Sequence, residues 1–189
     1  MQIFNSRFGR VMTIATISLL LLSVYVTAVD AGADAVFSML PTFALLSYIV
    51  ILVFWLPRVE IDEGGVRFRN IFNTVYISWA AINRIDTKWA LTIFTSDGKY
   101  SAWSASAPGR HSAIFATKDQ GSHLPESTYL AGTIRPGDLI TSDSGAAAAV
   151  IRRIWESKRD QAGIASVSKK VNVPSLILLG LLLAIASIL

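Results

Sequence analysis

The chain has 189 residues, of which 52% are hydrophobic and only 16% are charged, whereas soluble domains carry about 25% charged residues. This imbalance predicts a membrane protein with room for one compact domain. Because the sequence contains no cysteine, disulfide frameworks, thiolate metal sites and thiol nucleophiles are excluded. The net charge of +4 fits a domain held near an anionic membrane surface.

Two uncharged apolar runs near the start of the chain, at residues 11–29 and 35–57, predict membrane spans. Each is long enough to cross a hydrocarbon core of roughly 30 Å as a helix. Pro41 falls in the first turns of the second run, where its missing N–H costs little. Trp55 lies near the far end of that run, as an interfacial anchor should. A third run, 173–189, is at the lower limit for a span and is also compatible with a helix that only enters the interface.

The distribution of basic residues predicts the orientation of these spans. Arg7 and Arg10 precede the first span, and every other lysine and arginine lies between Arg58 and Lys170. The loop between the first two spans contains two aspartates and no basic residue. Lysine and arginine concentrate on the cytoplasmic flanks of spans. We therefore expect a multi-pass protein of the cell (plasma) membrane, with the N-terminus inside, residues 58–172 inside and the C-terminus outside.

An alternative interpretation makes the first span a cleaved signal peptide, with the small residues at 26–28 as its cleavage site. The domain after the second span would remain cytoplasmic in either case. None of the three runs contains Asp, Glu, Lys, Arg or His, which argues against an ion channel, a proton relay or a transporter.

Short antiparallel strands are predicted between residues 58 and 103. Val59 and Ile61 alternate with charged residues, and the same alternation resumes after the turn at 63–65. A helix is predicted from Ala146 to about Asp160, with an apolar stripe that the sheet can bury. Further strands are expected to begin at Val75, Ile85, Leu91 and Lys99, with a helical turn at 79–82, a hairpin turn at Asp97-Gly98 and a helix cap at Ser142 or Ser144.

These elements predict an α+β domain in which an antiparallel sheet is covered by one late helix. We expect the chain to consist of a membrane hairpin at 1–57, a cytoplasmic domain at 58–160, a linker at 161–172 and a C-terminal span at 173–189.

The order of several short motifs resembles a known family. Gly65 and its strand, the Ile77-Ser78-Trp79-x-x-Ile82 step, the Asp97-Gly98 hairpin and the late helix are similar to the pleckstrin-homology (PH)-like domains of small actinobacterial membrane proteins. The resemblance covers roughly residues 58–160. It implies a PH-like bent antiparallel β barrel or sandwich capped by a C-terminal helix, attached here to three transmembrane helices. It implies no defined reaction.

Residues 104–141 form a longer stretch than such a domain requires, with a candidate strand at 128–134. Both histidines of the chain, His111 and His123, lie in it, but their spacing matches no metal-ligand pattern. Nucleophile elbows and phosphate-binding glycine loops are also missing. We therefore expect no metal, no cofactor and no enzymatic activity; an enzyme sited in this loop would depend on the two histidines.

The candidate lipid-binding residues are Arg58, Arg67 and Arg69, which fall on the first two strands. Some PH domains bind phosphoinositides through a similar basic pattern. Acidic residues between these arginines, Glu60 and Asp62 among them, would repel a phosphorylated headgroup. A solvated strand face is therefore the simpler expectation, with weak attraction to anionic lipid of about 1 kcal/mol per basic residue.

Four tryptophans could stack on nucleic-acid bases, but core packing better explains Trp79 and Trp155, so we expect no nucleic-acid partner. The sequence favours a membrane-anchored, PH-like, non-enzymatic interaction module. It would dock a membrane-proximal protein partner, or a second copy of itself as a homo-oligomer, at the cytoplasmic membrane face. The alternative is a lipid-headgroup-sensing module that acts through the basic strand face.

Overall fold

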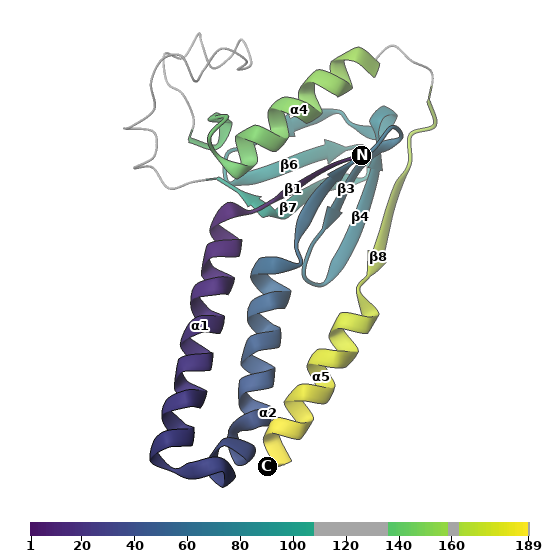
Figure 1. Cartoon of the computed structure of the whole chain (residues 1–189). Helices are drawn as coiled ribbons and strands as arrows, with labels where there is room; N and C mark the ends of the chain where they lie inside the picture. Colours follow the sequence, from purple (N-terminus) through teal and green to yellow (C-terminus); the bar gives the residue numbers. More distant parts are fainter. Residues whose placement is uncertain (108–135, 159–162, 189) are drawn as a thin grey trace.

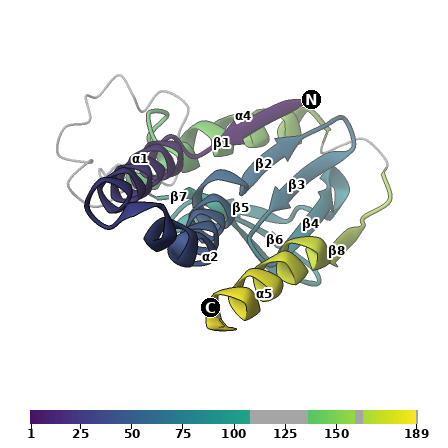
Figure 2. The same cartoon turned by 60° about the horizontal axis from the view of Figure 1, so that its bottom comes forward.

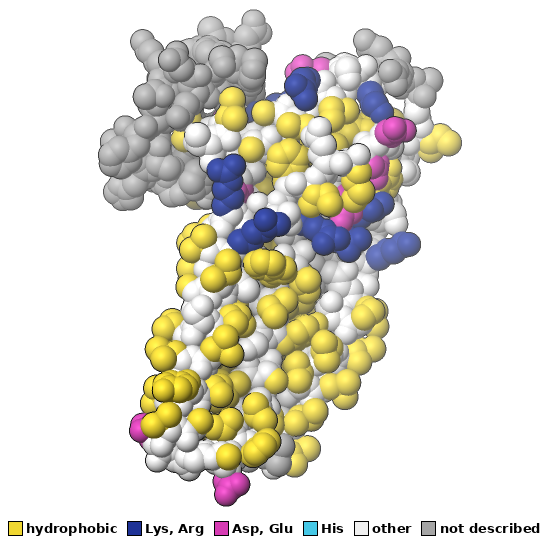
Figure 3. Space-filling view, in the orientation of Figure 1, with side chains coloured by type: hydrophobic (Ala, Val, Ile, Leu, Met, Phe, Trp, Pro, Cys, Tyr) yellow, Lys and Arg dark blue, Asp and Glu magenta, His cyan; other side chains and the backbone are white. Residues whose placement is uncertain are grey.

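The computed structural model describes residues 1–107, 136–158 and 163–188, in which a bundle of apolar helices carries a β domain at one end (Figure 1). Apolar side chains cover the visible surface of the helices (Figure 3). The apolar helices are α1 (Arg7–Asp30), α2 (Gly32–Val50), which continues into a π-helical turn η1 (Ile51–Trp55), and α5 (Val173–Ile188).

Two of these helices are long and apolar enough to cross a membrane. The segments Arg7–Asp30 and Gly32–Trp55 each contain 24 residues, and 6% of an apolar 18-residue stretch within each is buried in the protein. Large exposed apolar surfaces of this kind are unfavourable in water and suggest association with a membrane. Helix α5 has 16 residues and extends about 24 Å, which is less than the hydrocarbon thickness. The third predicted span therefore remains a proposal.

The position of Pro41 differs from its prediction. Because α2 begins at Gly32 rather than at residue 35, Pro41 lies inside the helix and not in its first turns. Its ring nitrogen cannot donate the helical hydrogen bond to the carbonyl of Phe37. Trp55 closes the second helix, and the guanidinium of Arg10 lies 5.6 Å from the centroid of its ring.

The strands form two antiparallel sheets. The larger has the order β1-β2-β3-β4-β8, and the smaller has the order β5-β6-β7. The strands are β1 (Gln2–Asn5), β2 (Arg58–Ile61), β3 (Gly65–Arg69), β4 (Asn73–Ser78), β5 (Arg84–Asp86), β6 (Ala90–Thr95), β7 (Gly98–Ser106) and β8 (Val167–Val171); short helices η2 (Trp79–Ala81) and η5 (Pro136–Asp138) and the helix α4 (Asp143–Lys158) complete the domain.

The antiparallel α+β architecture predicted from the sequence is confirmed, and it is consistent with a PH-like fold. The predicted hairpin turn is also present, with Gly98 at a φ of 144°. Two strands were not predicted. Strand β1 precedes the first helix and pairs with β2, and β8 lies within the expected linker at 161–172 and pairs with β4.

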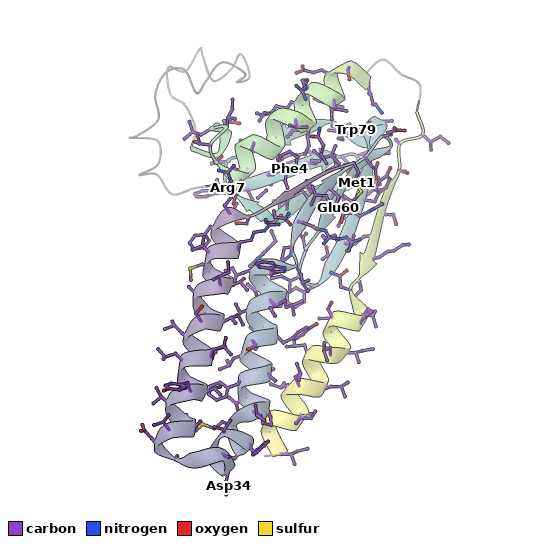
Figure 4. All side chains as sticks on the ribbon, viewed as in Figure 1. Met1, Phe4, Arg7, Asp34, Glu60 and Trp79 are labelled. Atoms are coloured by element: carbon purple, nitrogen blue, oxygen red, sulfur yellow. The ribbon has the colours of Figure 1, made fainter. Side chains whose placement is uncertain are left out.

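The core of the domain lies between the two sheets and α4. Val59, Phe68 and Ile77 from the larger sheet are fully buried with Ile93 from the smaller sheet and Ile151 from α4. The hydroxyl of Ser142 accepts a 2.9 Å hydrogen bond from the N–H of Gly145, which confirms Ser142 as the cap of α4. A cap of this type contributes about 1 kcal/mol. Figure 4 shows Phe4 of β1 directed towards α4, where it packs against this core.

Direct connections fix the domain to the helices. Strand β1 runs into α1 at Ser6, and the backbone N–H of Arg7 donates to Oδ2 of Asp143 at the start of α4 (3.1 Å). The carboxamide of Asn172, between β8 and α5, donates to the carbonyls of Asn70 and Ile71. The domain is therefore held at the end of the helices that is opposite to Asp34 (Figure 4).

Candidate functional site

A cluster of charged side chains occupies the outer face of the larger sheet. The antiparallel register places Arg58 opposite Arg69 and Glu60 opposite Arg67. Because side chains alternate between the two faces of a strand, these four residues share the face that points away from the core. The intervening residues, such as Val59, are buried on the other face.

Glu60 is the centre of this cluster, with only 1% of its side chain exposed. Its Oε1 accepts from Nε of Arg58 at 2.7 Å and from Nε of Arg69 at 2.9 Å. Its Oε2 accepts from Nη1 of Arg67 at 3.0 Å. The three arginine side chains remain 33–46% exposed, so one buried carboxylate holds three partly exposed cations in fixed positions.

The ionisation of Glu60 determines the charge of this cluster. Burial raises the pKa of Glu60. Hydrogen bonds from Arg58 and Arg67 and the charge of Arg69 together lower it by more than burial raises it, so the pKa lies below the usual value of 4.5. The carboxylate is therefore charged at neutral pH. Three guanidinium groups around one carboxylate leave a net formal charge of two positive units.

The charged face continues across β4 and β8. Arg69 lies opposite Thr74, and Thr74 lies opposite Lys170. In the neighbouring row of cross-strand residues on the same face, Arg67 lies opposite Tyr76. A basic row thus crosses the sheet to its edge strand, where Lys170 is exposed. The three arginines form ion pairs with Glu60 and Asp62, and among the described residues Lys170 takes no part in these ion pairs.

A groove of about 720 Å³ lies between this face and the ends of the apolar helices. Arg58, Arg67, Arg69 and Lys170 provide its basic wall. Its opposite wall comes from the last turn of α2–η1 and the first turn of α5, and includes Leu52, Leu56, Pro174 and Ser175. Figure 3 shows lysine and arginine side chains gathered in a band where the apolar helices meet the β domain. We call this feature the basic groove.

Tyr76 adds a polar group to the basic groove. The guanidinium of Arg67 lies 5.5 Å from the centroid of its ring. Burial and the nearby carboxylate of Asp62 raise the pKa of Tyr76, although Arg67 acts in the opposite direction. The phenol therefore stays protonated at neutral pH and can donate a hydrogen bond.

A second cavity of about 520 Å³ is almost entirely apolar. It lies on the other side of η1, between the start of α1 and strand β7, and its lining includes Phe8, Phe54, Phe72 and Trp103. It contains no charged side chain among the residues that line it, so it can accommodate apolar groups but offers no ionic recognition.

The three predicted lipid-binding arginines lie together, and Glu60, one of the acids expected to repel a headgroup, lies among them. Glu60 is buried beneath the arginines and positions them, and its charge still offsets one of theirs. A turn at residues 62–65 implies the register that places Glu60 opposite Arg67, so the sequence carried a signal for this pair. Lys170 was not predicted to join the site, because β8 was not recognised as a strand.

Other predicted features have different outcomes. Trp79 is buried and Trp155 packs against the core, as expected, whereas Trp89 and Trp103 are exposed. His111, His123 and the candidate strand 128–134 lie outside the described residues. Within the residues that the structure describes, no three His, Asp or Glu side chains are grouped as metal ligands would be.

Comparison with known proteins relates part of the chain to a described family. Residues 56–124 match the family described as "Bacterial PH domain", a range that begins at the end of η1 and includes strands β2 to β7. No curated protein and no solved structure shows significant similarity to the chain. Strand β8 and helices α4 and α5 lie outside the matched range.

Proposed function

Since the chain is a bacterial PH-like domain protein, we propose that it acts as a membrane-anchored, non-enzymatic interaction module at the cytoplasmic face of the plasma membrane. A bacterial PH domain suggests a module that contacts proteins or lipids. The observation that carries the proposal is the direct attachment of the domain to the apolar helices through three short chain connections, β1–α1, η1–β2 and β8–α5. This attachment holds the domain at the membrane surface, where only membrane-proximal partners can reach it.

The position of β1 supports the proposed orientation. Because β1 pairs with β2, the first and last residues of the helical hairpin lie on the same side of the membrane as the domain. The described lysines and arginines lie on that side, whereas Asp30 and Asp34 lie at the far end of the hairpin. This arrangement agrees with the positive-inside rule. Cleavage of a signal peptide near residue 28 would remove a strand of the sheet, which favours retention of the first helix.

Helix α5 fits the role of a third membrane segment. It runs alongside α2, and the hydroxyl of Tyr48 in α2 donates to the carbonyl of Ser175 in α5 (3.0 Å). Figure 2, in which the helices come forward, shows α5 below β8 and beside α2. A short helix can complete a crossing by local thinning of the bilayer. This would place the C-terminus outside.

The proposed partner is a membrane-proximal protein or a second copy of the chain. Trp89, in the turn before β6, is 76% exposed, and tryptophan is enriched among the residues that dominate binding energy at interfaces. We expect a photo-reactive amino acid at position 89 of the full chain, in native membranes, to form a discrete cross-link. The same substitution at Asp34, at the opposite end of the hairpin, is the matched control.

The outcomes of this cross-linking separate the alternatives. A hetero-adduct from position 89 identifies a protein partner, and an adduct of twice the chain mass identifies self-association. Adducts at position 34 with none at position 89 or at other exposed domain sites, such as Arg153, would contradict the proposal.

Lipid-headgroup sensing is the second candidate function. The observation that favours it is the cluster of Arg58, Arg67 and Arg69 around the buried carboxylate of Glu60, because preorganised cations lose little conformational entropy on binding an anion. It predicts that Arg67→Glu with Arg69→Glu abolishes binding of anionic vesicles.

A further inference from the structure

We propose that the basic groove binds the headgroup of an anionic phospholipid from the same membrane, which enters from the bilayer between the ends of α2–η1 and α5. This inference rests on the proposed membrane anchoring and specifies the ligand for the lipid-sensing alternative. It adds Lys170 and the helix ends to the three arginines that the sequence indicated.

The charge of the groove selects an anion. Glu60 balances one of the three guanidinium groups that surround it. Asp62, 3.8 Å from Arg67, and Lys170 have equal and opposite charges, so the groove keeps two positive units. Arg69 is the most exposed of the three arginines, at 46%, and its strand neighbour across β4 is Lys170. These two side chains present donors at the open side of the groove.

The apolar wall selects a lipid over a soluble anion. Leu56, Pro174 and Val171 line the same groove as the basic residues and are exposed. A free phosphate would leave this apolar surface in contact with water. A phospholipid would cover it with its glycerol and upper acyl atoms, which is favourable because apolar area is removed from water, while its phosphate contacts the cations.

The depth of the groove also fits a phospholipid. Its apolar wall belongs to the last turn of one apolar helix and the first turn of another. Those turns lie at the level where an anchored protein meets the lipid headgroups. Because β8 and α5 lie outside the range matched by the PH family, the groove combines strands β2 to β4 of the matched range with elements that lie beyond it.

Two neighbouring lysines allow a matched test. Lys169 and Lys170 are consecutive, exposed and equally charged, but alternation on β8 directs only Lys170 to the groove face, and only Lys170 lines the groove. We would measure retention of phosphatidylglycerol by the purified full chain in phosphatidylcholine nanodiscs, for the wild type, Lys169→Gln and Lys170→Gln. Lys170→Gln is expected to weaken phosphatidylglycerol binding at least about fivefold more than Lys169→Gln does.

Each outcome decides the inference. If Lys169→Gln and Lys170→Gln weakened phosphatidylglycerol binding equally, general attraction of the surface to anionic lipid would explain the binding. That result would overturn the proposed site. Complete displacement of the lipid by inorganic phosphate would also overturn it, because a soluble anion would then satisfy the groove. Arg69→Gln provides a second variant and is expected to reproduce the loss caused by Lys170→Gln. Loss of the lipid-binding proposal would leave the cross-linking result at position 89 unaffected. The two experiments therefore test the basic groove and the proposed interaction module independently.

Discussion

The indole Nε1 of Trp103 donates a 2.9 Å hydrogen bond to the backbone carbonyl of Val53. Val53 lies in the π-helical turn η1, and its carbonyl has no donor within the helix. Pro57, four residues later, has no N–H, and Arg58, five residues later, already begins strand β2. Trp103, from strand β7 of the smaller sheet, supplies the missing donor and thereby joins the end of the second apolar helix to the β domain.

We therefore expect Trp103→Phe to destabilise the full chain by about 1 kcal/mol, since it retains an aromatic ring but leaves the carbonyl without this donor. Thermal unfolding in detergent, followed by tryptophan fluorescence, would measure the effect. Trp89→Phe, at a more exposed position, is the control and is expected to change stability by less than about 0.5 kcal/mol. Equal effects of the two substitutions would refute a structural role for the indole hydrogen bond.

Glu60 predicts a pH dependence of stability. Its pKa is lower in the folded protein than the ordinary value of 4.5, so ionised Glu60 stabilises the fold fully above about pH 4.5. This stabilisation is lost as the pH falls below 4.5 and through the lower folded-state pKa. The unfolding temperature of the wild type should therefore fall over this acidic range.

Glu60→Gln removes the titrating group and should flatten this part of the stability curve. At neutral pH the variant should be less stable than the wild type, because three guanidinium groups then lack their shared carboxylate. Asp97→Asn, in the exposed hairpin turn, is the control and should keep the acidic slope. A wild-type slope that persists in Glu60→Gln would assign the pH dependence to other carboxyl groups.

The sequence predicted the strands with clear alternation, and it did not predict the two strands that complete the larger sheet. Strand β1 is four residues long and precedes an apolar helix, so it offers no periodic pattern. Strand β8 contains two adjacent lysines next to an apolar run, a composition that equally suits a linker at a membrane surface. Both strands form only because β2 and β4 present free edges, and such pairing is a tertiary effect.

Only the three arginines of the candidate site were predictable from the sequence. Arg58, Arg67 and Arg69 were identified from their spacing, but the role of Glu60 depends on burial between strands. Lys170 joins the site only through the β4–β8 register. The apolar wall of the basic groove comes from helix ends that the sequence assigned to the membrane alone.

Asp138 stabilises the connection between η5 and α4. It is 4% exposed, and its Oδ1 accepts from the hydroxyl of Thr87 at 2.6 Å and from Nη2 of Arg152 at 3.0 Å. Asp138→Ala would leave a buried hydroxyl and a largely buried guanidinium without their acceptor. We expect a loss of about 3 kcal/mol in the free energy of unfolding, measured by denaturant titration in detergent. Glu156→Ala, on the exposed side of α4, should change it by less than about 0.5 kcal/mol.

Gly9 sets the distance between α1 and the end of the second apolar helix. A Cβ at this position would lie 2.5 Å from the carbonyl oxygen of Phe54, whereas a Cβ at Gly180 in α5 meets nothing within 4 Å. Alanine is favoured over glycine in helices by about 1 kcal/mol, so Gly180→Ala should be neutral or stabilising. Gly9→Ala should instead lower the unfolding temperature, because α1 must move away from η1. If both substitutions raised it, α1 and η1 would not be in the close contact on which the fixed position of the domain depends.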